Sequence, residues 1–171
     1  MKLFLNFFIV FFSATLIGFS QSQAVFKKIN QSSGLSNGRI TSMAKEKDGF
    51  VWIGTNNGLN RYDGLGFKVY NSTIGSNDIS DILIDSKNRI WITTLGGGLN
   101  YYNPLNDTFL IFKNNLNNPK SLMSNNVSTL IEDSKGLIWL GTEKGLCCFN
   151  PIDKQFVSYT NQFNNNQTKK S

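Results

Sequence analysis

The chain has 171 residues, a length that suits one domain able to bury most of its apolar surface. It contains no His, which excludes a phosphoaccepting histidine and His metal ligands, and we expect no cofactor and no metal. The 17 basic residues exceed the 11 acidic ones. The doublets Lys27-Lys28 and Lys169-Lys170 form no stripe with aromatic residues, however, so nucleic-acid binding is not expected.

Residues 1–24 have the pattern of a secretory signal peptide. One early charge, Lys2, precedes a run rich in Phe, Leu and Ile, and the segment ends at Ser22-Gln23-Ala24. We therefore expect cleavage after Ala24, a periplasmic or secreted protein, and no membrane attachment after cleavage. An uncleaved membrane anchor is the alternative, because the apolar run is almost long enough to cross a bilayer.

One sequence pattern occurs three times, each time around a Trp residue. The copies read ITSMAKEKDGFVWIGTNNGLNRYD, ISDILIDSKNRIWITTLGGGLNYYN and VSTLIEDSKGLIWLGTEKGLCCFN. Internal repeats of roughly 40–50 residues indicate a β-propeller or a solenoid.

Within each copy, the Trp lies in a short strand that is apolar on both faces. In the first copy, Phe50 and Trp52 alternate with Val51 and Ile53. Such a strand is buried on both faces, as in a propeller blade between two neighbours. We therefore expect the Trp side chains to belong to the core, and replacement of Trp139 by Ala to lower the unfolding free energy by roughly 3–5 kcal/mol. The predicted core residues are Trp52, Trp91 and Trp139.

Turn residues around the Trp strand predict four strands in each copy. Gly49, Asn88 and Gly136 suit hairpin corners before this strand, because Gly and Asn tolerate a positive φ. A third strand follows, and then a fourth that begins with Phe. This last pattern occurs at four places, Phe26, Phe67, Phe109 and Phe156.

The predicted fold is all-β: three four-stranded antiparallel propeller blades and one N-terminal closing strand, residues 26–29, in an incomplete ring. The partial propeller is expected to span residues 25–160, and the polar, Asn-rich residues 161–171 are predicted to be disordered. The blades are expected at about residues 39–70, 78–112 and 126–159.

Ligand candidates lie in the turns between the second and third strands of the copies. In a blade these turns share one rim with the long loops that lead into the first strands, and long loops on one face usually carry binding. Asn amides both donate and accept hydrogen bonds, which suits sugar hydroxyls, although Asn is also common in turns for backbone reasons. The candidates are Asn56, Asn57, Gly96, Gly97, Glu143 and Lys144.

Cys147 and Cys148 occupy strand positions that hold other residue types in the first two copies. Neighbours on a strand point to opposite faces, and a disulfide between them would be strained. No CxxC spacing accompanies them, so we interpret them as substituted strand residues, and their redox state stays open.

The segments DSKGLIWLGTEKGLCCFNP, DGFVWIGTNNGLNRYD and SSGLSNGRITSM resemble the two-component regulator propeller repeat, and the second copy matches less well at residues 92–98. That repeat builds the periplasmic sensor regions of hybrid two-component systems in Bacteroidetes-type bacteria. The resemblance implies a ligand-sensing propeller portion of such a regulator, associated with glycans and with an oligosaccharide as the ligand. Because the chain has no His, it implies a truncated or stand-alone sensor without kinase output.

Two other functions are considered. The first is a protein-interaction module that completes a propeller ring with another chain or with itself, because open blade faces favour association. The second is a propeller enzyme, which we do not expect. Lys47, Ser86 and Ser134 stand where a sialidase-type Asp-box requires Asp. The acidic residues that precede the Trp hairpins are interpreted as stabilising the turns: Glu46, Asp85 and Asp133.

Overall fold

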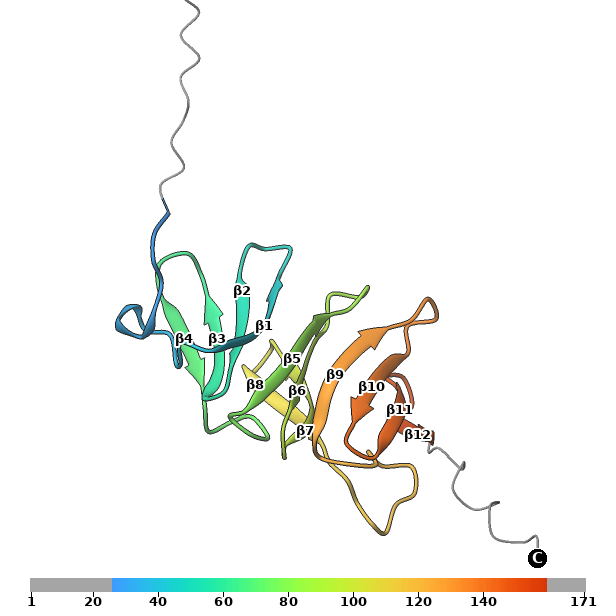
Figure 1. Ribbon diagram of the computed structural model, residues 1–171. Coiled ribbons are helices and arrows are strands. Elements are labelled where there is room, and N and C mark those ends of the chain that lie inside the picture. Colours follow the sequence, from blue (N-terminus) through green and yellow to red (C-terminus); the bar gives the residue numbers. More distant parts are fainter. Residues whose placement is uncertain (1–25, 160–171) are drawn as a thin grey trace, which may run out of the picture.

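The computed structural model describes residues 26–159 (Figure 1). The predicted signal peptide and the predicted disordered tail, with its basic doublet, lie outside the described residues. Within residues 26–159, no helix has the length and hydropathy needed to cross a membrane.

Three four-stranded antiparallel sheets follow one another along the chain, each in simple strand order. One short 3-10 turn, η1 (Gln31–Ser33), precedes them. The first sheet holds β1 (Ile40–Lys45), β2 (Val51–Thr55), β3 (Gly58–Tyr62) and β4 (Phe67–Tyr70). The second holds β5 (Ile79–Ile84), β6 (Ile90–Thr94), β7 (Gly98–Asn103) and β8 (Thr108–Phe112). The third holds β9 (Val127–Glu132), β10 (Ile138–Thr142), β11 (Gly145–Asn150) and β12 (Gln155–Tyr159). The prediction of all-β propeller blades is confirmed, and in chain order the sheets are blades 1, 2 and 3.

The first strands of the blades, β1, β5 and β9, lie side by side at the centre of the arrangement (Figure 1). Asp81 on β5 joins all three. One carboxylate oxygen accepts from Ser42 Oγ on β1 at 2.9 Å, and the other from Thr129 Oγ1 on β9 at 2.9 Å and from the Leu130 N–H at 3.2 Å. This carboxylate therefore connects the inner edges of three blades.

Aromatic side chains fill the space between neighbouring blades. Between blades 1 and 2, Trp52 stacks on Tyr70 and meets Tyr102 edge-on. Between blades 2 and 3, Trp91 meets Phe149 edge-on. Each of these two Trp strands is thus covered on the face that the next blade packs against, which is why its sequence is apolar on both faces.

The third Trp differs from the first two. Trp52 and Trp91 are 0% and 3% exposed, whereas Trp139 is only partly buried. Its core assignment therefore needs correction: Trp139 stacks on Tyr159, but among the described residues no further blade covers this face of blade 3.

Residues 26–29 do not form the closing strand that was predicted for them. They are irregular, and the Phe26 side chain is 93% exposed. A strand needs a partner edge for its backbone hydrogen bonds, and the described chain has no fourth sheet that could provide one.

Candidate functional site

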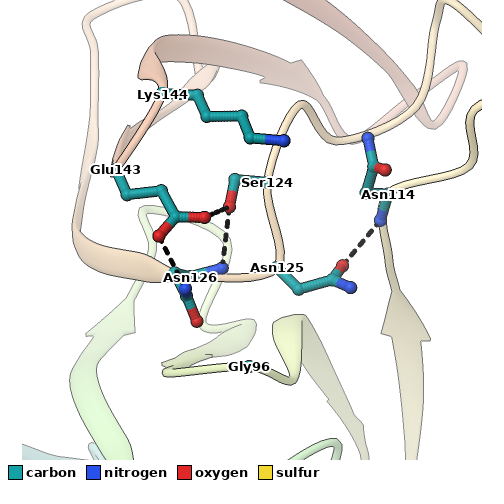
Figure 2. A pocket seen from close by; sticks show the side chains of 7 residues that line it. All are labelled: Gly96, Asn114, Ser124, Asn125, Asn126, Glu143 and Lys144. Carbon is teal, nitrogen blue, oxygen red and sulfur yellow. Dashed lines mark hydrogen bonds between the residues drawn. The ribbon is translucent and has the colours of Figure 1, made fainter.

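A rim of the propeller collects the loops that lead into the first strands and the turns between the second and third strands. At the junction of blades 2 and 3, this rim holds an open pocket of about 280 Å³ (Figure 2). It is lined by Gly96, Asn114, Ser124, Asn125, Asn126, Glu143 and Lys144. The lining comes from the turn of blade 2, the turn of blade 3 and the long loop between β8 and β9.

The carboxylate of Glu143 organises this rim pocket. Its Oε1 accepts from Ser124 Oγ at 2.7 Å and its Oε2 from Asn126 Nδ2 at 2.7 Å (Figure 2). These two hydrogen bonds, with the charge of neighbouring Lys144, lower the pKa of Glu143 below its usual range. The residue is therefore an anion at neutral pH, and it holds the end of the long loop against the turn.

Two further lining residues, Asn114 and Asn125, hold the long loop by hydrogen bonds within it. Asn125 Oδ1 accepts from the Asn114 N–H at 2.7 Å, and Asn114 Nδ2 donates to the Leu122 carbonyl at 2.7 Å. Among the described residues, no hydrogen bond uses Asn126 Oδ1, Asn125 Nδ2 or Lys144 Nζ. Two donors and one acceptor are thus available to a ligand.

The loops that lead into blades 1 and 2 are held in a different way. Asn60 and Asn100 are fully buried on the third strands. Their Oδ1 atoms accept from the backbone N–H of Ser36 and Gly75, both at 2.9 Å, and so clamp each loop to its own blade. Strand pairing places Cys147 at the equivalent position of blade 3, where no such clamp can form.

Three of the six predicted ligand residues line the rim pocket: Gly96, Glu143 and Lys144. Asn56 and Asn57 lie on the turn of blade 1, outside the pocket, and Asn56 Nδ2 donates to Asp78 Oδ1 at 3.0 Å. Gly97 is buried, which removes it from the candidates. It packs so closely on Gly75 that a Cβ at either position would collide with the other backbone.

The sequence did not single out Asn114, Ser124, Asn125 and Asn126 individually, although it placed the long loop at this rim. The sequence feature that could have pointed to them is the length of the loop between β8 and β9, which exceeds that of the loop between β4 and β5. Which of its many polar residues face the pocket depends on how the loop folds back on the turn of blade 3.

The cysteines are buried and form no disulfide. Burial, more than the nearby Asp133 carboxylate, raises the pKa of the Cys148 thiol. The described residues contain no group of three or more Cys, Asp and Glu side chains placed to hold a metal ion.

Three segments of the chain, residues 34–57, 73–96 and 121–144, match the family described as two component regulator propeller. A histidine kinase from Formosa agariphila is 37% identical over 59 residues, which cover 34% of this chain and 4% of that protein.

The fold is also similar to solved structures. One is the extracellular domain of a putative hybrid two component system from B. thetaiotaomicron, with a TM-score of 0.72 and 27% identity over 78% of this chain and 20% of that chain. Another is the extracellular domain of a putative one component system from the same organism, with a TM-score of 0.60 and 26% identity over 70% of this chain and 16% of that chain.

A virginiamycin B lyase from Staphylococcus aureus shares the fold alone, with a TM-score of 0.55 and 17% identity over 72% of this chain and 42% of that chain. The chain spans 4% of the length of the matched histidine kinase, and 20% and 16% of the two extracellular domains. Three of its segments match the two component regulator propeller family, and its fold is similar to the extracellular domain of a putative hybrid two component system.

Proposed function

We propose that the chain is a ligand-sensing propeller portion of a two-component regulator, exported by its signal peptide, and that it binds an oligosaccharide at the rim pocket between blades 2 and 3. The observation that carries the proposal is the arrangement of Glu143. Its carboxylate is ordered by two hydrogen bonds, next to an amine and two amides that have unused donors and an acceptor.

Sugar hydroxyls donate and accept at once, so they match a pocket that offers two donors and one acceptor. The polar lining and the open shape favour such a ligand over an apolar one. Glu143 is the only carboxylate in the lining and Ser124 Oγ donates its hydrogen to it, so the proposed role is recognition without chemistry. Because the chain has no His, we assign phosphorylation to another part of the signalling system.

Calorimetric titration of the purified chain with a panel of neutral and acidic oligosaccharides tests this proposal. We expect one class of oligosaccharide to bind, and Lys144→Ala and Asn125→Ala to weaken its binding about tenfold each. Asn56→Ala is the matched control, since Asn56 lies on the same rim outside the pocket, and it should leave the affinity unchanged. Absence of binding across the panel would count against the proposal.

A second candidate function is association with another propeller blade. Trp139 stacks on Tyr159 with ring centroids 5.4 Å apart, close to the 5.6 Å of Trp52 and Tyr70. Blade 2 covers the stack of Trp52 and Tyr70, whereas Tyr159 is 49% exposed. The open face of blade 3 therefore has the shape that a further blade, from a second copy or another chain, would cover.

Sedimentation velocity tests this candidate. Self-association that is lost on Tyr159→Lys but retained on Leu105→Lys, a change at an exposed turn, would support it. A folded monomer over the accessible concentration range would rule out association with a second copy, and retained association of the Tyr159 variant would show that this face is not responsible.

A further inference from the structure

A second groove lies at the opposite rim, again between blades 2 and 3, with a volume of about 200 Å³. One wall is formed by Trp91, Tyr101, Leu110 and Phe112 of blade 2, and the mouth carries Arg89 and Lys154. No acidic residue lines it. The groove is separate from the rim pocket, and a ligand could bind in it whether or not the rim pocket binds an oligosaccharide.

The equivalent place between blades 1 and 2 shows what kind of group fits there. The Asp107 carboxylate lies across that junction and accepts from Tyr70 Oη at 2.7 Å, from Tyr102 Oη at 3.0 Å and from the Lys68 ammonium. A carboxylate paired with a lysine thus fills the junction next to aromatic rings.

Strand pairing shows that this arrangement is lost between blades 2 and 3. Leu110 takes the place of Lys68, and Phe112 and Phe149 take the places of the two tyrosines, so both hydroxyls are absent. Lys154 takes the place of Asp107, and the two residues share a positive φ of 58° and 56°. Blade 3 therefore brings a cation to the position where blade 2 brings a carboxylate.

Of the two cations at the mouth of the groove, only Lys154 has no carboxylate partner among the described residues. Arg89 Nε pairs with Asp85 at 2.6 Å, while no ion pair within the described residues involves Lys154. The adjacent carboxylate of Asp153 accepts from Asn150 Nδ2 at 3.1 Å and from the Gln155 N–H at 3.0 Å.

We propose that this groove binds a small organic acid, with its carboxylate at Lys154 and Arg89 and a flat apolar body against Tyr101, Leu110 and Phe112. The charge of Lys154 favours an anion, and the wall favours a ring that can stack on an aromatic side chain. The volume lies below the roughly 300–1,000 Å³ of sites for drug-sized ligands, so the ligand is compact.

Titration of the full chain with phenylacetate, followed by calorimetry, tests the proposal. Acetate supplies the charge without the ring, and 2-phenylethanol supplies the ring without the charge. We expect phenylacetate to bind at least about tenfold more tightly than either, and Lys154→Gln to remove most of that advantage. Lys47→Gln, at an exposed turn of blade 1 outside both pockets, is the matched control and should have no effect.

A double variant that recreates the Lys–Asp pair of blades 1 and 2 between blades 2 and 3 gives a second test. Leu110→Lys together with Lys154→Asp restores the ion pair of blades 1 and 2 inside the groove, and should abolish phenylacetate binding while circular dichroism shows an unchanged fold. The proposal is overturned if 2-phenylethanol binds as tightly as phenylacetate, if Lys154→Gln binds phenylacetate normally, or if the wild-type chain binds none.

Discussion

Each Trp indole donates its N–H to a carboxylate at the start of its own hairpin. Glu46, Asp85 and Asp133 accept at 2.6, 2.8 and 2.9 Å. Asp85 and Asp133 also accept backbone N–H groups of their turns, so the interpretation of these acids as turn-stabilising is confirmed for both. The hydrogen bond from the Trp139 indole is the main cause of the lowered pKa of Asp133. One carboxylate therefore joins the turn to the Trp side chain of its blade.

The exposure of the Trp residues separates their expected contributions to stability. We expect Trp52→Ala to lower the unfolding free energy by roughly 3–5 kcal/mol, because the side chain is fully buried between two blades. Trp139→Ala should cost less than about 3 kcal/mol, because within residues 26–159 no blade covers one face of its ring. Urea unfolding of both variants measures the difference. Equal losses would show that the open face of blade 3 is covered in solution.

The buried Asn clamps allow a second test on single residues. In Asn100→Ala the Gly75 N–H loses its acceptor, and we expect its amide exchange to speed up by about tenfold and the fold to lose about 1–3 kcal/mol. Cys147→Ala is the matched change in blade 3, where no clamp exists, and should leave amide exchange of residues 121–126 unaltered. Hydrogen exchange followed by NMR compares the two, and a protected Gly75 amide in the first variant would contradict the clamp.

At the scale of elements, the blades are joined by aromatic packing with polar groups at its edge. Asp107, on the turn between β7 and β8, reaches back to blade 1 and holds Lys68 and Tyr70. Lys68 is the main cause of the lowered pKa of Asp107, followed by the Tyr70 hydroxyl. Desolvation and the Asp107 hydrogen bond raise the pKa of Tyr70 in turn. The junction is thus stabilised by a carboxylate that must stay ionised.

The lowered pKa of Asp107 makes the stability of the folded chain depend on pH. A carboxyl group with a lowered pKa in the folded state adds stability at neutral pH, which is lost as the pH falls below its ordinary value of about 4. We expect Asp107→Asn to be less stable than the wild type at pH 7 and to lose less stability between pH 5 and about pH 2. Thermal unfolding across this range measures it, with the exposed Asp48→Asn as control. Parallel curves for Asp107→Asn and the wild type would contradict the role.

At the scale of the whole molecule, Asp81 connects the three blades at their inner strands. Replacement by Ala would leave two hydroxyls and two backbone N–H groups without this acceptor, including those of Ile82 and Leu130. We expect a loss of about 1–3 kcal/mol and a broader unfolding transition, because the blades would become less tightly coupled. Scanning calorimetry checks both. An unchanged transition would show that strand pairing within the blades dominates the fold.

The fold could be predicted from the sequence because its causes are local and repeated. Alternation of apolar residues around Trp52, Gly and Asn at hairpin corners, and three copies of one pattern were sufficient for blade number and strand order. Of the residues that line the rim pocket, the sequence analysis had named Gly96, Glu143 and Lys144. Glu143 and Lys144 stand out as turn residues, whereas the contributions of Asn125 and Asn126 depend on how a long loop folds.

By itself, the sequence determined the all-β architecture, the four strands of each blade and the rim on which the long loops lie, since strand periodicity and turn chemistry act over a few residues. Only the tertiary structure decided which blade faces are covered, so that Trp139 is partly exposed while Trp52 is not. It also decided that residues 26–29 form no strand and that Gly97 is buried. These outcomes depend on contacts between segments far apart in the chain, and a backbone edge or an aromatic face is satisfied only when such a partner is present.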